Sequence, residues 1–332
     1  MTASTHSRQL PEAVQQLAAA AQVSLQAPSV FNTQPWRWRV AGDVLELYAE
    51  HGRQLEATDP DGRLLLLSCG AALHHARVAL AAAGWSLTVD RLPDGSRPDL
   101  LARLRLGKAV PADPEAQMMA GAMKRRRTDR RAFSDREVPA ATLTRLRRLV
   151  EAEGTYLHVV RQDQIPMLAI SAELAADAEG DDADYQAELA HWTSRPRWSR
   201  DGVPPETAVE PGLRRVPVRD FAPETEAGLS VGAGIDKGAA YVVIFGMTDR
   251  PIDLLRGGEA LSALLLKASA EGLSTAPLSD TIEVSWPRHL LRGLIADIGE
   301  PYIVVRLGYA GSSDPLPPVP RRAAADVIDV LG

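Results

Sequence analysis

The segment QAPSVFNTQPWRW, residues 26–38, holds two prolines, three aromatic side chains and an Asn-x-Gln pair. It follows an alanine-rich helical pattern that begins at Pro11, and it leads into WRWRVAGDVLELYAE, which is typical of two strands. Side-chain amides both donate and accept hydrogen bonds, so Asn32 and Gln34 suit the wall of a ligand site. The alternative is a plain helix-to-strand connection in which Trp36 fills the core.

The composition is that of a globular protein. The chain has 332 residues, of which 45% are hydrophobic and 24% charged, and this length is enough for two domains. The net charge of −6 gives no general basic field for nucleic acid. The single cysteine, Cys69, lies in an apolar context and rules out a disulfide framework or a cysteine-based zinc site.

Targeting and metal signals are weak. The N-terminus lacks the charged start and apolar core of a secretion signal, and His74 and His75 follow the longest apolar run closely. The seven histidines do not have metal-ligand spacing, so no metal is expected. We therefore expect a cytoplasmic protein without a membrane or nucleic-acid partner.

The second half of the chain repeats the order of elements in the first half. Pro139 opens a second helical pattern, and the strands TYLHVVR and YVVIFGM follow it. Residues 70–84 and 258–272 are small-residue helices with the same glycine-to-glycine spacing, and each precedes a strand that contains Arg-Leu-Gly. The shared order favours an ancient duplication that produced two related halves.

Residues 181–238 have no counterpart in this repeat. They are polar, rich in Pro, Gly and Arg, and include Trp192 and Trp198. Such a long irregular segment within a compact fold is usually a functional flap or a disordered insert. The tail SSDPLPPVPRRAAADV is expected to be an extended strap that carries a basic pair.

Four segments together resemble the FMN-binding nitroreductases. APSVFNTQPW resembles the family's signature after an early helix, and KRRRTDRRAFSDREVP, residues 124–139, resembles its opening motif. AEGLSTAPLSD, residues 270–280, is similar to the loop that passes the flavin ring. RLGYA, followed by prolines and Arg-Arg, is similar to the C-terminal end. The motifs are divided between the two halves, as in the fused, Acg-like branch in which one chain imitates a dimer.

The resemblance implies a fold and its division. The fold would be α+β, a three-layer α/β/α nitroreductase fold that forms a single-chain pseudo-dimer with a lid insertion. Residues 1–115 would form the first half, which carries APSVFNTQPW. Residues 116–332 would form the second half, with RRTDRR, the flavin-ring loop and a lid at 181–238. Family dimers bind FMN between subunits, so we expect a single chain to suffice for one FMN.

The resemblance also assigns roles to the basic residues. Arg126 and Thr128 would bind the phosphate of FMN, since a guanidinium fork matches phosphate oxygens. Arg130 would lie near the pyrimidine edge of the ring, and Arg321 or Arg322 would close the phosphate pocket from the tail. The competing interpretation is that KRRRTDRR is a solvated basic turn, as charge runs usually are.

Two further groups would bind the ribityl chain and the ring. The first-half group is Pro28, Ser29, Asn32 and Gln34. The second-half group, which would run past the ring edge with a backbone N–H directed at N5, is Pro277, Leu278, Ser279 and Asp280. Ser-Asp here departs from the Glu-Gly of many family members. No side chain is expected to be catalytic in its own right, because the flavin performs the chemistry.

The leading hypothesis for function is an FMN-dependent oxidoreductase. NAD(P)H would reduce the flavin, and a nitro compound, quinone or similar small-molecule acceptor would reoxidise it. A rival hypothesis is an FMN-binding or sequestering protein whose lid covers the flavin and allows little NAD(P)H-dependent turnover. A flavin-free nucleic-acid binder is disfavoured by the acidic composition.

Overall fold

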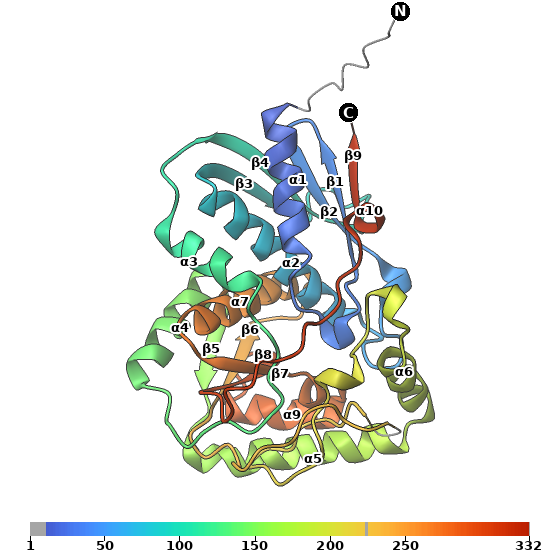
Figure 1. The fold of residues 1–332 in the computed structure, drawn as a ribbon, viewed down its shortest axis with the longest axis vertical. Coiled ribbons are helices and arrows are strands. Elements are labelled where there is room, and N and C mark those ends of the chain that lie inside the picture. The colour runs from blue at the N-terminus through green and yellow to red at the C-terminus, as the bar shows by residue number, and fades with distance from the viewer. Residues whose placement is uncertain (1–10, 223–224, 332) are drawn as a thin grey trace, which may run out of the picture.

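The computed structural model describes residues 11–222 and 225–331 (Figure 1). Residues 1–10, whose sequence lacks a secretion-signal pattern, lie outside the described residues, as do 223–224 of the predicted lid and residue 332. The helices are α1 Glu12–Ser24, α2 Arg63–Ala82, α3 Pro114–Met123, α4 Ala140–Ala152, α5 Ile165–Asp181, α6 Ala183–Thr193, α7 Pro251–Ala270, α8 Asp280–Glu283, α9 Ser285–Leu294 and α10 Ala324–Val327.

The strands form two separate sheets. The first has the order β3-β4-β2-β1-β9, and the second has the order β5-β6-β8-β7. The strands are β1 Trp36–Ala41, β2 Val44–Ala49, β3 Trp85–Arg91, β4 Leu100–Ala109, β5 Tyr156–Val159, β6 Ala240–Gly246, β7 Ser274–Leu278, β8 Glu300–Gly308 and β9 Ile328–Leu331. Helices and sheets are thus mixed along the chain, which confirms the α+β prediction.

The two sheets repeat one topology. When the first four strands of each half are numbered in chain order, both sheets have the third strand at one edge, followed by the fourth, the second and the first. All of these neighbouring strands pair in antiparallel orientation. The repeat extends to the register of single residues. The matching pairs are Thr88 with Arg105 and Val89 with Leu104 in the first sheet, and Ala276 with Arg306 and Pro277 with Val305 in the second. This register supports the interpretation of two related halves.

The long helices α2 and α7 pack against each other between the sheets (Figure 1). Their contact centres on Gly70 and Gly258, the residues that the sequence repeat aligns. A Cβ atom on Gly70 would lie 2.0 Å from the carbonyl oxygen of Leu255, and one on Gly258 would lie 2.0 Å from that of Leu67. Only glycine permits backbones to approach this closely.

Helix α2 is also the one described helix that is long and apolar enough to cross a membrane, and most of its length is buried inside the protein. Its apolar residues pack against α1 and the first sheet in one core cluster, while α7, α4, α5 and α9 contribute to a second cluster around the second sheet. The apolar run is therefore explained by its place in the core.

The C-terminal tail crosses from the second half to the first. After β8 the chain runs as a strap across both halves, and β9 then pairs with β1 in parallel (Figure 1). Residues beyond 116 therefore complete the sheet of the first half. The predicted lid is not wholly irregular, because it contains α6 and two short 3-10 turns, Arg197–Ser199 and Pro205–Thr207.

Gly258→Ala tests the helix crossing. The added methyl group would collide with backbone atoms of α2, so we expect a loss of about 1–3 kcal/mol in the free energy of unfolding. The matched control is Gly180→Ala in α5, where a Cβ atom meets nothing within 4 Å. Chemical denaturation measures both. Equal stability of the two variants would contradict the close approach.

Candidate functional site

The segment between α1 and β1 has unusual backbone geometry. Phe31, Asn32 and Gln34 have φ angles of 49°, 55° and 50°, in the left-handed region that non-glycine residues rarely adopt. Each such residue costs on the order of 1–3 kcal/mol and persists only where its surroundings fix it. Here the Oγ of Ser29 accepts a hydrogen bond from the backbone N–H of Gln34 at 2.9 Å. Backbone strain of this kind often accompanies a binding site.

Asn32 connects three parts of the chain. Its Nδ2 donates to the carbonyl oxygens of Gly202 and Pro320 at 3.0 and 3.1 Å, and its Oδ1 accepts from Arg321 at 3.0 Å. The lid and the C-terminal strap are therefore both attached to the first-half segment. One side chain thus fixes the position of Arg321.

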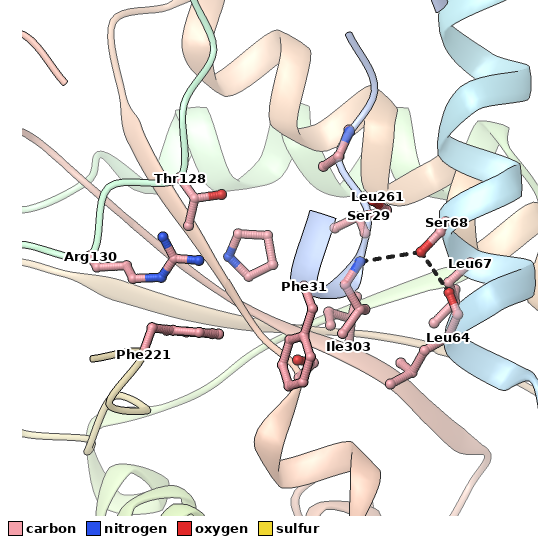
Figure 2. A pocket seen from close by; sticks show the side chains of 14 residues that line it. Ser29, Phe31, Leu64, Leu67, Ser68, Thr128, Arg130, Phe221, Leu261 and Ile303 are labelled. Atoms are coloured by element: carbon pink, nitrogen blue, oxygen red, sulfur yellow. Dashed lines mark hydrogen bonds between the residues drawn. The ribbon is translucent and has the colours of Figure 1, made fainter. Parts of the chain in front are cut away.

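A cavity with two adjacent chambers, which share part of their lining, lies beside this segment. The apolar chamber is bounded by α2, α7, β8 and the lid; Figure 2 shows Arg130 and Phe221 on one side of it, and Leu64, Leu67 and Ser68 of α2 on the other. The second chamber contains three arginines and lies beneath lid residues 202–204 and Thr207. The residues shared by both chambers are Pro28, Ser29, Phe31, Thr128 and Arg130.

The arginine chamber has cations without counter-charges. Arg126 is 5% exposed, and its Nε and Nη1 atoms are buried without a hydrogen-bond partner in the described residues. Arg321 bonds only neutral oxygens, and its Nε is likewise unpartnered there. No carboxylate among the described residues forms a salt bridge with Arg126, Arg130 or Arg321. A buried charge without a partner is costly, so an anion in this chamber would be stabilised by the guanidinium groups.

Burial shifts the pKa values of these arginines downward. Desolvation, followed by the charge of Arg127, lowers the pKa of Arg126 to about 10. Desolvation and the charges of Arg126 and Arg127 lower the pKa of Arg321 to about 9. Desolvation and the charges of Arg219 and Arg306 lower the pKa of Arg130 to about 10. All three values stay above neutral pH, so the chamber remains positively charged.

Arg306 fixes the loop that carries Arg126 and Arg130. It is fully buried in β8, and it donates to Asp236 at 2.5 Å and to the carbonyl oxygens of Asp129 and Arg131 at 2.8 and 3.0 Å. Asp236 lies at the end of the lid segment. The guanidinium of Arg306 therefore holds both the loop of residues 126–131 and the end of the lid at Asp236 against the second sheet.

The lid contributes one wall of the apolar chamber. Phe221 meets Phe31 edge to face with ring centroids 5.8 Å apart, and Arg130 lies 4.3 Å from the centroid of Phe221. Arg219, two residues away, bonds Glu179 at 2.8 Å and Glu283 at 2.5 Å. Trp192 packs in the same apolar cluster as Phe31 but lines neither chamber, and Trp198 is 83% exposed. Phe221, and not a tryptophan, is therefore the aromatic residue through which the lid lines the cavity.

The cavity brings together most of the residues that the sequence singled out. Those that line it are Pro28, Ser29, Asn32, Arg126, Thr128, Arg130, Pro277, Ser279 and Arg321. Pro277 and Ser279 face the cavity while Leu278 packs in the core, as expected where successive side chains of a strand point to opposite sides.

Three other predicted residues do not line either chamber. The amide of Gln34 binds Arg200 and Arg322 main-chain atoms at 3.0 and 2.9 Å. Arg322 pairs with Glu50 at 2.7 Å, so its charge is already neutralised. Asp280 is buried and accepts from the N–H of Thr281.

Sequence reasoning missed several cavity residues. They are Val30, Phe31, Leu64, Leu67, Ser68, Gly202, Val203, Pro204, Thr207, Phe221, Leu261, Ile303 and Val319. Helical leucines look like any core residue, and a lid phenylalanine has no motif around it. The positive φ of Phe31 was likewise invisible in the sequence.

The chain has clear relatives among curated proteins, although no family model matches it. It is 39% identical over 315 residues to "Putative NAD(P)H nitroreductase Rv3131" of Mycobacterium tuberculosis H37Rv, covering 92% of this chain and 89% of the relative. It is 35% identical over 315 residues to "Putative NAD(P)H nitroreductase acg" of the same strain, covering 94% and 95%. The chain belongs to the nitroreductase family. Its similarity to the acg protein confirms the predicted resemblance to the Acg-like branch.

Solved nitroreductase structures also resemble the chain. One is the FMN and NADPH-dependent nitroreductase NfnB from sphigopyxis sp. strain HMH, at 17% identity and a TM-score of 0.42. The match covers 64% of this chain and 99% of that chain.

The unpartnered charge in the arginine chamber leads us to expect an unusual effect of substitution on stability. Arg126→Met removes an unpartnered buried charge, so the ligand-free protein should keep its melting temperature or gain a few degrees. Arg125→Met, at the exposed neighbouring position, is the control. Thermal unfolding of the ligand-free proteins measures this. A clear fall in melting temperature for Arg126→Met would show that the guanidinium is structural.

Proposed function

We propose that this nitroreductase-family chain binds one FMN and acts as an NAD(P)H-dependent oxidoreductase, which passes electrons to a nitro compound, quinone or similar small-molecule acceptor. The observation that carries the proposal is the arginine chamber, with unpartnered guanidinium nitrogens, joined to an apolar chamber. FMN has the same two parts, a phosphate dianion and an apolar ring system. The names of the relatives, NAD(P)H nitroreductases, agree with this activity.

The residues present fit the phosphate and the ring. Arg126, Arg321 and Thr128 would hold the phosphate, because guanidinium groups make paired charge-assisted hydrogen bonds to its oxygens. The ring would lie in the apolar chamber, with Arg130 placed to interact with its polar edge. When bound, FMN supplies the redox chemistry; the protein binds it, orients it and excludes water.

One chain is sufficient for this site in the proposal. Residues 28–32 come from the first half and residues 126–130 from the second, and both line the same cavity. We accordingly propose the division into halves at 1–115 and 116–332, with residues 181–238 as the lid and with the strap crossing between the halves. We also propose that the protein acts in the cytoplasm, independently of nucleic acid and membranes.

FMN retention tests the phosphate assignment. Arg126→Ala should raise the dissociation constant for FMN by roughly 10- to 150-fold, since hydrogen bonds to charged groups contribute about 1.5–3 kcal/mol. Arg125→Ala is the control. Equal FMN affinity in the Arg126 and Arg125 variants, measured by fluorescence titration, would refute the assignment.

The position of Phe221 favours a second candidate function, FMN sequestration without turnover. Phe221 lies against Phe31 and Arg130 in the apolar chamber, where a nicotinamide or acceptor would have to approach the ring. Arg219 anchors the adjoining lid segment through two buried carboxylates. A lid held in this way would exclude the reductant.

Anaerobic rapid mixing separates the two functions. Bleaching of the flavin band by NADPH or NADH within seconds is expected for the oxidoreductase. Bleaching by dithionite alone would establish sequestration instead. Phe221→Ala should increase the rate of bleaching by NAD(P)H, because it removes the aromatic wall. Trp198→Ala, which removes an exposed lid aromatic, should leave the rate unchanged.

A further inference from the structure

The arginine chamber adjoins a second and larger hollow in the protein. A groove of about 790 Å³ lies between lid residues 193–206 and strap residues 317–320, whereas the arginine chamber holds about 60 Å³. The chamber and the groove are adjacent because they share three lining residues, Val203, Pro204 and Val319. We refer to these three residues as the wall. The lid contributes two of them and the strap contributes the third.

The wall consists of residues with little conformational freedom. Val203 is 5% exposed, and its backbone N–H donates to the carbonyl oxygen of Trp192 at 2.9 Å. Val203 precedes Pro204, and Val319 precedes Pro320. A proline has a fixed φ angle, and the residue before a proline is restricted as well. The backbone at the wall therefore resists the rotations that would move its side chains aside.

Asn32 holds the wall from both of its ends. Its Nδ2 bonds the carbonyl oxygens of Gly202 and Pro320, which are the chain neighbours of Val203 and Val319. An amide nitrogen has two hydrogens, and both are used in these two bonds. The Nδ2 of Asn32 consequently has no hydrogen left to donate to a ligand in the chamber.

Gln34 makes a second connection of the same kind. Its Nε2 donates to the carbonyl oxygen of Arg200 at 3.0 Å in the lid, and its Oε1 accepts from the backbone N–H of Arg322 at 2.9 Å in the strap. The remaining hydrogen of Nε2 bonds the carbonyl oxygen of Asn32 at 3.3 Å. The two amides that the resemblance assigns to the cofactor thus tie the lid to the strap.

The place of the wall bears on the shape of the flavin that can bind. In the proposed function, the phosphate of the flavin lies among the arginines of the chamber. The phosphate of FMN is a monoester, so FMN ends there. In FAD the same phosphate continues into adenosine monophosphate, which needs room beyond the chamber. The large space that adjoins the chamber is the groove, and the wall lies at their boundary.

We propose that the wall, held in place by Asn32 and Gln34, makes the site specific for FMN over FAD. This proposal rests on the proposed function, because it takes the phosphate to lie among the arginines. Asn32 and Gln34 act as positioning residues, since their amides fix the wall. A constrained wall that collides with the longer ligand and spares the shorter one converts a difference in ligand length into a difference in affinity.

Flavin titration of the flavin-free protein tests this proposal. Wild type should bind FMN at least about 100-fold more tightly than FAD, as judged from quenching of flavin fluorescence. Asn32→Gly removes the amide, and glycine readily adopts the φ of 55° at this position. This variant should lower the FMN-to-FAD affinity ratio by about tenfold or more. Ala296→Gly, at an exposed position that also has φ of 55°, is the control and should keep the ratio.

A second variant changes the wall itself and leaves both amides intact. Val319→Gly removes a side chain that lines the chamber and the groove, so it should also lower the affinity ratio. Pro317→Ala is the matched control, because Pro317 lines the groove but not the chamber. Thermal unfolding of each variant establishes that it is folded before the titration.

The outcomes separate this proposal from the proposed function. Wild type that binds FAD as tightly as FMN would overturn the specificity and leave the proposed function intact. An affinity ratio that stays unchanged in either folded variant, Asn32→Gly or Val319→Gly, or that falls equally in the controls, would have the same meaning. Wild type that binds neither flavin would overturn both.

Discussion

The contact between Gly70 and Gly258 determines the geometry on which the cavity depends. Side chains on the same two helices form its walls, with Leu64, Leu67 and Ser68 from α2 and Leu261 from α7. Any residue larger than glycine at the crossing would separate the helices and shift both walls. The close spacing of α2 and α7 thus depends on Gly70 and Gly258 having no side chain.

Charge is distributed unequally around this helix pair. Buried arginines on one side lack carboxylate partners, whereas Arg77 and Arg91 on the other side are neutralised by Glu153 and Glu259. An uncompensated cation in a low-dielectric interior is tolerated when a ligand supplies the missing charge. The buried positive charge that lacks a partner is therefore confined to one chamber.

The sequence was informative where residue identity alone carries the chemistry. The succession of helices and strands along the chain, the repeat, the basic loop and the first-half segment could be predicted, because hydrophobic periodicity, glycine spacing and arginine clusters are local patterns. The order of the strands within each sheet could not. The cavity indeed brings Ser29, Arg126 and Thr128 together. The sequence was not informative where the role of a side chain depends on its partners in the folded protein. Arg321 and Arg322 are adjacent and chemically identical, yet only Arg322 meets a carboxylate.

The strap has a consequence for when the site can form. Arg321 bonds Asn32 across a sequence separation of 289 residues, and the strap then continues into β9, which pairs with β1. Contacts so distant in sequence form late in folding. The arginine chamber is therefore complete only after residue 321 has been synthesised and has reached Asn32.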